Sequence, residues 1–585
     1  MNLKINKDLL PMKGHYFLWN AGTAPIVPFM SVYARQLGLS SFIVGIIYTV
    51  LSFSGMLAKP LMGSLADKFQ CRKLIFLVAQ CVAAAAFFSM IFLPPIPQTK
   101  SLARAHFVCD AAEAGFEICR DNLDNYALTK IQSNVKEKDV ICTMDCPFKA
   151  RDWDIACKYW NISSSCERKT SRITFDARVP LNHSFQIDTC IYFRTPSVTI
   201  KQAQDIEPFC PLYHQITTDC DINCNAQVID NMMTTTEQVT NVSDYHQFWL
   251  LLMVYLIAWI GQAVTVSVAD TLCFQLLGHK PHKYGYQRMC GALGWGIFSI
   301  ISGILVDQFS NADETDKNYV PVFGMGVAVL LLCVVVSYQI QYSHQAISSS
   351  ILKDMCRLLT NIRILVFTLW CICMGLCTAM MWNFLFWHLE DLASKHSYET
   401  QACIKTIEGL VMGIQCLGGE LPFFFLSSWI LKRIGHVHAM SLVLLVMGVR
   451  FMFYSILVNP WWTLPIECLN GLTFGLFYAT MASYASIVAP PGTETTTQGM
   501  VGAVFEGVGV SLGSFIAGLL LEEIGGSKTF RAFGIFALVA CLIHALVQYL
   551  IQGSEKFRKD SVARYAAPQD AMFMFTEFDE DLQDS

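Results

Sequence analysis

Charged side chains are scarce in this chain. They make up 15% of its 585 residues, whereas 54% of the residues are hydrophobic, and an ordinary soluble domain carries about 25% charge. This shortage excludes a soluble globular protein. The sequence also has no basic patch for nucleic acid, no nucleotide-binding loop, no nucleophile elbow and no metal-binding helix motif. It therefore predicts neither an enzyme nor a nucleic-acid-binding protein, and it indicates no cofactor and no metal.

Long apolar segments dominate instead. The first of them lacks a small-residue cleavage site, so we expect the first helix to act as its own insertion signal. About 20 apolar residues suffice to cross roughly 30 Å of hydrocarbon. Twelve such segments occur, roughly at 14–34, 41–64, 74–94, 247–269, 289–307, 320–341, 363–387, 405–429, 438–458, 463–488, 498–521 and 530–551. We therefore expect an all-α polytopic membrane protein with twelve transmembrane helices.

These segments predict six regions along the chain. Residues 1–97 hold spans one to three, 98–246 form a long polar loop, and 247–341 hold spans four to six. A short polar linker follows at 342–362, then spans seven to twelve at 363–552 and a tail at 553–585. The order of three helices, loop, three helices, linker and six helices divides the chain into two halves of six spans.

The long loop holds ten of the 23 cysteines, namely Cys109, Cys119, Cys142, Cys146, Cys157, Cys166, Cys190, Cys210, Cys220 and Cys224. It also holds three Asn-X-Ser glycosylation sequons, at Asn161, Asn182 and Asn241. Both features belong to the oxidising, non-cytosolic side of a membrane. We expect up to five disulfides, with a pairing that the sequence leaves open. Two Cys-X-X-X-Cys pairs have zinc-like spacing, but this compartment favours disulfides.

The distribution of basic residues predicts the same orientation. With the long loop outside, the cytosolic segments hold sixteen Lys and Arg residues, and the short outer loops hold six, which are Arg35, Lys317, Lys395, Lys405, Lys528 and Arg531. This bias is the one expected when both termini are cytosolic. We expect a multi-pass glycoprotein of the plasma membrane or an endomembrane.

A motif lies between the second and third spans. Gly63 permits close helix approach, Asp67 ends a span beside basic partners, and Arg72 and Lys73 begin the next span. The segment resembles the G-x-L-A-D-x-x-x-x-R-K signature of the major facilitator superfamily, although Gln70 stands where that family usually has glycine. The resemblance implies two pseudo-symmetric six-helix bundles around a central cavity that opens alternately to either side.

The fourth and fifth spans carry two costly charges. Asp270 lies at the end of the fourth span and Arg288 at the start of the fifth, and an ion in hydrocarbon needs a partner or a wet cavity, so we expect the two to pair. Trp295 follows on the same helix face as Arg288, two turns on, where its indole can stack on a ligand ring. The alternatives are a substrate site and a purely structural ion pair.

The stretch around Arg288 resembles the fifth helix of the proton-coupled disaccharide (lactose) permease-like subfamily, Phe-Gly-Arg-X-Arg-Met-X-Gly-X-X-Gly-Trp. The resemblance implies substrate-binding roles for Asp270, Arg288 and Trp295, and we add Asn20 in the first span as a fourth predicted substrate contact. Aspartate replaces the subfamily's glutamate. Lys59 in the second span is interpreted either as a lysine that reaches the interface or as a gating or anion-attracting residue.

The second half contains a further set of polar residues flanked by apolar ones. They are predicted to carry ion coupling or ion pairs, and comprise Glu420, Arg450, Glu467, Asn470 and Glu506. Arg450 matches the buried arginine in the ninth helix of the permease, whereas Asn470 stands where the permease has a titrating histidine. A carboxylate of this set could carry a proton, or Arg450 and Glu467 could form a static brace. The glycines around Glu506 indicate a close helix contact.

Across its spans the chain resembles the metazoan branch of major facilitator superfamily domain-containing protein six, on the fifth-helix motif, the Gly-Glu420-Leu-Pro-Phe-Phe-Phe run and the Leu-Asn470-Gly-Leu-Thr-Phe-Gly run. The resemblance implies a solute carrier, a symporter for a small polar, sugar-like solute with protons as the coupling ion. The alternative is a cell-surface receptor or scaffold whose extracellular loop binds a protein ligand.

Overall fold

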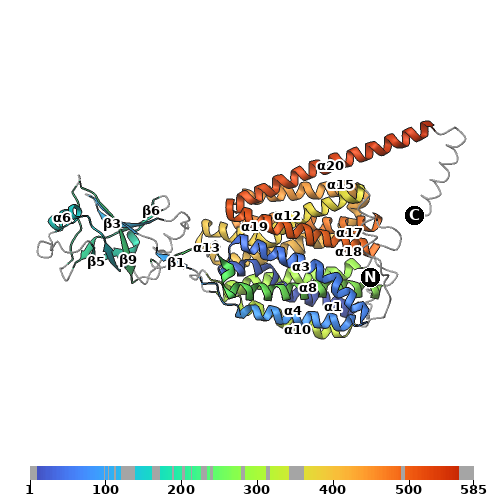
Figure 1. The fold of residues 1–585 in the computed structure, drawn as a ribbon, viewed down its shortest axis with the longest axis horizontal. Helices are drawn as coiled ribbons and strands as arrows, with labels where there is room; N and C mark the ends of the chain where they lie inside the picture. Colours follow the sequence, from blue (N-terminus) through green and yellow to red (C-terminus); the bar gives the residue numbers. More distant parts are fainter. Residues whose placement is uncertain are drawn as a thin grey trace.

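The computed structural model describes residues 9–97, 99–102, 105–110, 113–119, 139–160, 172–187, 190–200, 205–211, 214–225, 229, 234–237, 241–277, 284–310, 316–340, 362–488 and 494–565. It consists of a helical part and a smaller β-sheet domain at one end of it (Figure 1). The sequons at Asn182 and Asn241 lie on exposed residues, whereas Asn161, Cys166 and nearly all of the predicted linker lie outside the described residues.

The helical part comprises two sets in chain order. The first set is α1 Leu10–Thr23, η2 Val27–Phe29, α2 Met30–Gln36, α3 Ser41–Lys68, α4 Arg72–Ser89, η3 Met90–Phe92, α8 His246–Leu277, α9 Tyr284–Gln308 and α10 Val320–Tyr338. The second set is α12 Ile362–His396, α13 Tyr398–Ala402, α14 Ile404–Ile414, η7 Gln415–Glu420, α15 Leu421–Ser455, η8 Pro460–Trp462, α16 Thr463–Glu467, η9 Gly471–Gly475, α17 Leu476–Val488, α18 Glu494–Ala503, η10 Val504–Val510, α19 Ser511–Ile524 and α20 Gly526–Tyr565.

Ten helices in the described residues are long and apolar enough to cross a membrane. The two other predicted spans, 14–34 and 463–488, are helical but interrupted. The first breaks between α1 and α2, where Pro25 and Pro28 supply no backbone N–H for a helical hydrogen bond. The second breaks between α16 and η9, around Asn470.

Two expected boundaries also differ. The predicted eighth and ninth spans join within α15, where Gly435 adopts a φ of 75° at the break. The predicted tail at 553–585 begins as helix, because α20 continues to Tyr565. Asp270 does not close its helix, since α8 runs on to Leu277.

The long polar loop folds into an antiparallel β domain with its own hydrophobic core. An eight-stranded sheet has the order β6-β7-β3-β2-β9-β4-β5-β8. Its strands are β2 Ala105–Cys109, β3 Ala114–Cys119, β4 Asp139–Cys146, β5 Ile173–Pro180, β6 Phe185–Ile187, β7 Cys190–Arg194, β8 Ser197–Thr199 and β9 Ile216–Cys224. The first half of β9 pairs with β2 and its second half with β4. A separate pair, β1 Thr99–Leu102 and β10 Thr234–Glu237, connects the domain to the helices (Figure 1).

Disulfides fasten this domain as predicted. Four are formed, Cys109–Cys210, Cys119–Cys190, Cys142–Cys224 and Cys146–Cys220, and Cys157 is also disulfide-bonded. The two Cys-X-X-X-Cys pairs therefore bond to each other across strands β4 and β9. A domain of this size with few helices gains much of its stability from such cross-links, by about 2–4 kcal/mol each.

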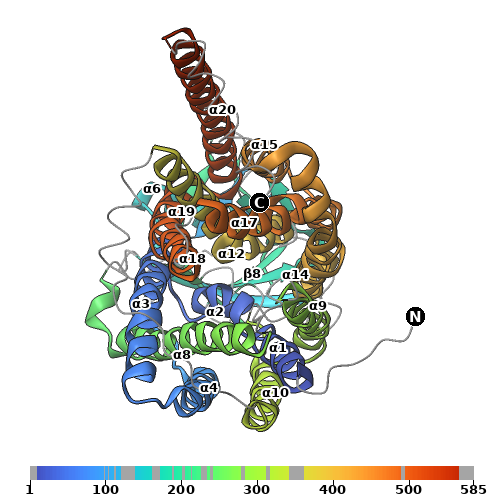
Figure 2. The same ribbon diagram turned by 90° about the vertical axis from the view of Figure 1, so that its right-hand side faces the viewer.

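The helices of the first set lie on one side and those of the second set on the other (Figure 2). The sets meet where α3 packs on α19 and where α9 packs on α14. We call the end of the helices beside the β domain the β-domain end, and the opposite end, where α1 begins and α3 ends, the terminal end (Figure 1). At the β-domain end, a Cβ on Gly45 would lie 2.6 Å from the backbone oxygen of Ser514, and one on Gly303 would lie 2.1 Å from that of Lys405.

The structure describes part of the motif between α3 and α4. Among the described residues, no heavy atom lies within 4 Å of a Cβ built on Gly63, so no described helix approaches it closely in this conformation. Lys73 lies over the ring of Tyr338, 4.9 Å from its centroid, and Arg72 is buried at the start of α4. The Asp67 side chain lies outside the described part.

Gln70 is the one described non-glycine residue with a positive φ, 51°. A left-handed backbone strains any residue with a Cβ. Gln70→Gly should therefore raise the free energy of unfolding by about 0.4–1 kcal/mol, which a thermal shift of the purified protein in detergent can measure. The control Ser64→Gly, at an exposed position inside α3, should lower it by about 0.5 kcal/mol. A lower melting temperature for Gln70→Gly would contradict this account.

Candidate functional site

Asp270 and Arg288 form an ion pair between α8 and α9. Arg288 Nη1 lies 3.1 Å from Asp270 Oδ1 and 3.2 Å from Oδ2, and the hydroxyl of Tyr16 in α1 donates to Oδ1 at 2.7 Å. The side chains of Arg288 and Asp270 are 32% and 25% exposed, respectively. Three elements of the first set thus converge on one carboxylate, whose pairing leaves part of each ion accessible.

Asn20 and Trp295 lie near this pair along α1 and α9. The Asn20 amide donates to the backbone oxygen of Tyr16 at 2.9 Å, and it fills the space beside Gly291, where a Cβ would lie 2.6 Å from Asn20 Nδ2. Trp295 is partly buried. Neither residue hydrogen-bonds to the Asp270–Arg288 pair among the contacts described, so their roles as substrate contacts stay predictions.

Arg288 also reaches the second set of helices. Its guanidinium carbon lies 5.9 Å from the ring centroid of Tyr478 in α17. Tyr478 is in turn within electrostatic range of Lys59 and Glu506, which form an ion pair between α3 and η10 with 29% and 44% of their side chains exposed. Lys59 therefore does not simply extend to the interface. It binds a carboxylate of the other set.

Three segments of the second set form π-helical turns, and three of the five predicted polar residues lie in or beside them. Glu420 ends the π-helix η7, Asn470 immediately precedes the π-helix η9, and Glu506 lies inside the π-helix η10. Single π turns within α-helices occur frequently at functional sites, because the wider turn redirects side chains and frees backbone groups. The hydrophobic pattern of the sequence does not reveal a π turn.

A second polar cluster is fully buried in the second set. Arg450 in α15 pairs with Glu467, which also accepts a hydrogen bond from Tyr454, and the two ions are 1% and 0% exposed. Arg450 Nη1 donates to Asn470 Oδ1 and to Thr473 Oγ1, each at 2.8 Å. The pairing of Arg450 with Glu467 that the static-brace alternative requires is therefore present, and we call this cluster the brace.

The brace connects to the first set through one more carboxylate. Asn470 Nδ2 donates to Glu420 Oε1 at 3.3 Å. Glu420 is within electrostatic range of both Arg288 and Arg450. Glu420 therefore lies between the brace and the Asp270–Arg288 pair.

Sequence reasoning missed a third group of charges, at the β-domain end. Glu408 and Lys405 in α14 are 0% and 1% exposed, and Lys405 binds both Glu408 and Glu390 of α12. Asp307 of α9 binds Lys317 and Thr406. Glu408 lies inside an apolar segment, which was a usable signal. Lys317 and Lys405 were instead counted as loop residues.

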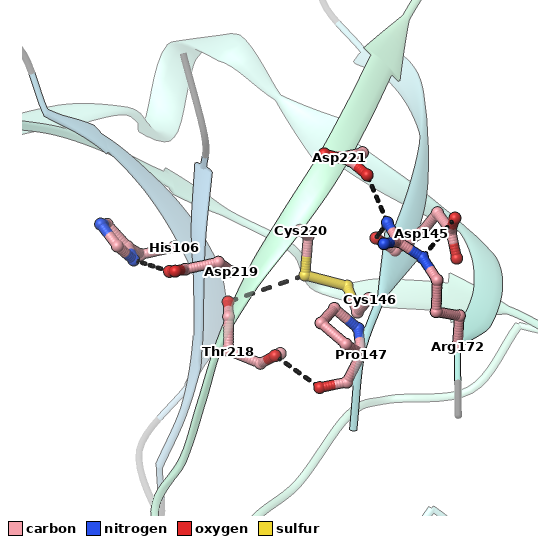
Figure 3. The surroundings of a disulfide bond; sticks show 9 residues. All are labelled: His106, Asp145, Cys146, Pro147, Arg172, Thr218, Asp219, Cys220 and Asp221. Carbon is pink, nitrogen blue, oxygen red and sulfur yellow. Dashed lines mark hydrogen bonds and ion pairs between the residues drawn. A yellow bond between two sulfur atoms is a disulfide. The ribbon is translucent and has the colours of Figure 1, made fainter. Parts of the chain in front are cut away.

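The β domain has a shallow hollow of about 460 Å³ beside the Cys146–Cys220 disulfide. Its charged side chains bind one another (Figure 3): His106 pairs with Asp219, and Arg172 pairs with Asp145 and Asp221. The two carboxylates raise the pKa of Arg172, with their hydrogen bonds to it as the main cause. A group of Glu117, Cys119 and Cys190 has metal-like spacing, but its two cysteines form a disulfide.

Comparison with solved structures shows the fold. The nucleoside transporter NupG, in a mutant form, superposes with a TM-score of 0.57 at 12% identity, covering 92% of this chain and 99% of that one. A mutant of the peptide transporter POT in complex with sulfate gives 0.52 at 10% identity, covering 94% and 96%. At these identities the likeness concerns the fold alone.

Proteins of similar sequence include a member of the major facilitator superfamily and a permease. The "Major facilitator superfamily domain-containing protein 6-like protein B" of Xenopus laevis is 23% identical over 93% of this chain and 91% of its own length. A maltose permease of Geobacillus stearothermophilus is 22% identical over 49% of this chain and 68% of its own. The receptor alternative finds no support among these proteins.

These likenesses define a multi-pass membrane protein of the major facilitator type, and not an enzyme. A model of the MFS_1 like family matches residues 9–532, and the chain belongs to that family.

The burial of the brace predicts a contrast between two carboxylates. Glu467→Gln leaves Arg450 as an uncompensated buried charge and should lower the free energy of unfolding by about 3–5 kcal/mol. Glu506→Gln breaks a partly exposed pair and should cost about 1 kcal/mol or less. Thermal unfolding of the purified variants in detergent measures both. Equal losses would show that the two pairs are equivalent.

Proposed function

We propose that this chain is a secondary active transporter for a small polar solute, with twelve spans in two six-helix bundles that rock around a site near the bilayer midplane. One contact carries this proposal: Arg288, paired with Asp270 of the first set, faces the ring of Tyr478 in the second set. A solute bound at this place would touch both sets and could couple their movement.

The chemistry of this place favours a polar solute with hydroxyl or anionic groups. Asp270, Arg288, Tyr16 and Glu420 offer both donors and acceptors, and the partly exposed pair keeps capacity for further hydrogen bonds. Tyr478 and Trp295 supply aromatic faces on which a sugar-like or heterocyclic ring can stack. The maltose, nucleoside and peptide named for the relatives and neighbours are all polar molecules.

The packing between the sets supports alternating access. Contacts of α3 with the η10–α19 segment follow one antiparallel register, from Gly45 with Gly518 to Met56 with Gly507. Continuing this register brings Gly63 opposite Gly499 and Gly502, yet among the described residues none of these three glycines has a neighbour within 4 Å of a built Cβ. We interpret this as a conformation closed at the β-domain end and open at the terminal end.

Uptake tests the assigned site. Arg288→Ala should lower solute transport at least about tenfold, because the loss of a charged partner to a bound polar group costs roughly 1.5–3 kcal/mol. An untargeted metabolite comparison of cells with and without the protein identifies the solute, and its uptake into vesicles is then measured. Arg433→Ala, at an exposed arginine that stacks on Trp429, is the matched control. Undiminished flux in Arg288→Ala would remove the site.

Glycosylation tests the orientation. We propose that the β domain is extracellular or lumenal, with both termini in the cytosol. Asn182 is exposed on this domain and Asn241 is exposed between β10 and α8, and sequons are modified only on that side. Replacing both asparagines with glutamine should increase mobility on a gel, as glycosidase treatment of the wild type does. If glycosidase treatment leaves the gel mobility of the wild-type protein unchanged, the result contradicts this orientation.

A further inference from the structure

The two sets of helices are joined at the β-domain end by a charge cluster with a buried centre, which we call the end cluster. It comprises the cations Arg35, Lys317 and Lys405 and the carboxylates Asp307, Glu390, Asp391 and Glu408. At the centre, the Lys405 ammonium lies 3.0 Å from Glu408 Oε2 and also binds Glu390. Lys405 and Glu408 are 1% and 0% exposed.

Bonds of this cluster cross from one set to the other. Arg35 of α2 donates to Glu390 and, at 2.6 Å, to Asp391 Oδ1, both on α12. The Asp307 carboxylate on α9 accepts from the backbone N–H of Thr406 at 2.6 Å and from its hydroxyl at 2.8 Å. Opening the β-domain end would break these bonds and expose the cluster to water.

The charges of the end cluster do not balance. Its three cations face four carboxylates, and around Lys405 a single ammonium serves both Glu390 and Glu408. An uncompensated charge is costly in a buried site, and a carboxylate there becomes neutral by binding a proton. This cost of burying an uncompensated charge disappears when the β-domain end opens and exposes the cluster to water.

In the part of the chain that the structure describes, the surroundings of Glu408 supply no further buried cation. From the elements packed against it, the groups that face Glu408 are Lys405, Glu390, Asp307 and the ring of Tyr319. Tyr319 is neutral and lies under Lys405, 5.8 Å from the ammonium. The charged side chains of Asp316, Lys395 and Glu399 lie at the exposed rim, where water screens them.

We propose that Glu408 is the proton-binding residue of the transport cycle, and that closure at the β-domain end takes up one proton from the solution on that side. This inference rests on the proposed function, since it presupposes an opening and a closing at that end. It differs from our expectation that Glu420, Glu467 or Glu506 carries the proton. Glu408 binds the proton where the two sets meet, so protonation and closure are one event.

Linkage gives the direction of the effect. The closed state holds one proton more than the open state, so closure is favoured as the pH falls, by about tenfold in the closed-to-open ratio per pH unit. Glu408→Gln has the shape of the protonated residue and brings the cluster to three cations and three carboxylates. This variant should stay closed at the β-domain end at every pH.

The experiment uses hydrogen exchange of the full-length protein in lipid nanodiscs between pH 5 and 8, corrected for the pH dependence of chemical exchange. Peptides covering 41–49 and 404–412 report the β-domain end of α3 and of α14. In the wild type their protection should increase as the pH falls, and in Glu408→Gln it should be high and constant. Glu390→Gln also removes one carboxylate, so its protection should likewise be independent of pH. This variant replaces Glu408→Gln in the experiment if Glu408→Gln folds poorly.

Glu522→Gln is the matched control. Glu522 is an exposed carboxylate at the same end that accepts from the hydroxyl of Ser41 at 2.8 Å, but it lies outside the end cluster. It should keep the wild-type pH dependence. Protection that does not change with pH in the wild type, or that changes equally in Glu408→Gln, overturns the proposal. Because no solute is added, that result would leave the Arg288-dependent transport test unaffected.

Discussion

The high cost of an ion in a low-dielectric interior is the constraint on which this structure depends. In the helical part, charged side chains whose burial in isolation would cost too much free energy occur in groups. These are Asp270 with Arg288, Arg450 with Glu467, Lys59 with Glu506, and the end cluster around Lys405. Two kinds of group result. The pair of Arg450 and Glu467 is sealed within one set of helices, whereas the others connect helices of the two sets or lie where the sets face each other.

This division matters for movement. A sealed pair keeps the same partners while the sets shift as bodies, so it can only stabilise its own set. A bond between sets exists in one conformation and breaks in another, and a solute or a proton can bias that choice only through groups that differ between the two. The Lys59–Glu506 pair belongs to this second kind, as do the contact of Arg288 with Tyr478 and the bonds that Arg35 and Asp307 of the end cluster make to the second set. The three π-helical turns bring Glu420, Asn470 and Glu506 of the second set to the same region.

The β domain follows a different physical rule. Its strands pack around a hydrophobic core that includes Phe107, Phe116 and Phe175. Its disulfides link β9 to β4 and β3 to β7. The exposed ions of its hollow bind one another across a water-accessible surface, where such pairs add little stability. The domain is therefore built to persist as a unit, independently of any rearrangement among the helices.

The sequence by itself determined the membrane class, the position of ten of the helices, the disulfide-rich domain and the pairing of Asp270 with Arg288, because hydropathy, cysteine density and single charges within apolar segments are local properties of a chain. Tertiary structure alone decided that Tyr478 faces Arg288, that Glu506 binds Lys59, and that Lys317 and Lys405 leave the loops for the end cluster. These contacts join residues far apart in the chain. Their geometry depends on helix packing and on π turns that no hydrophobic pattern records.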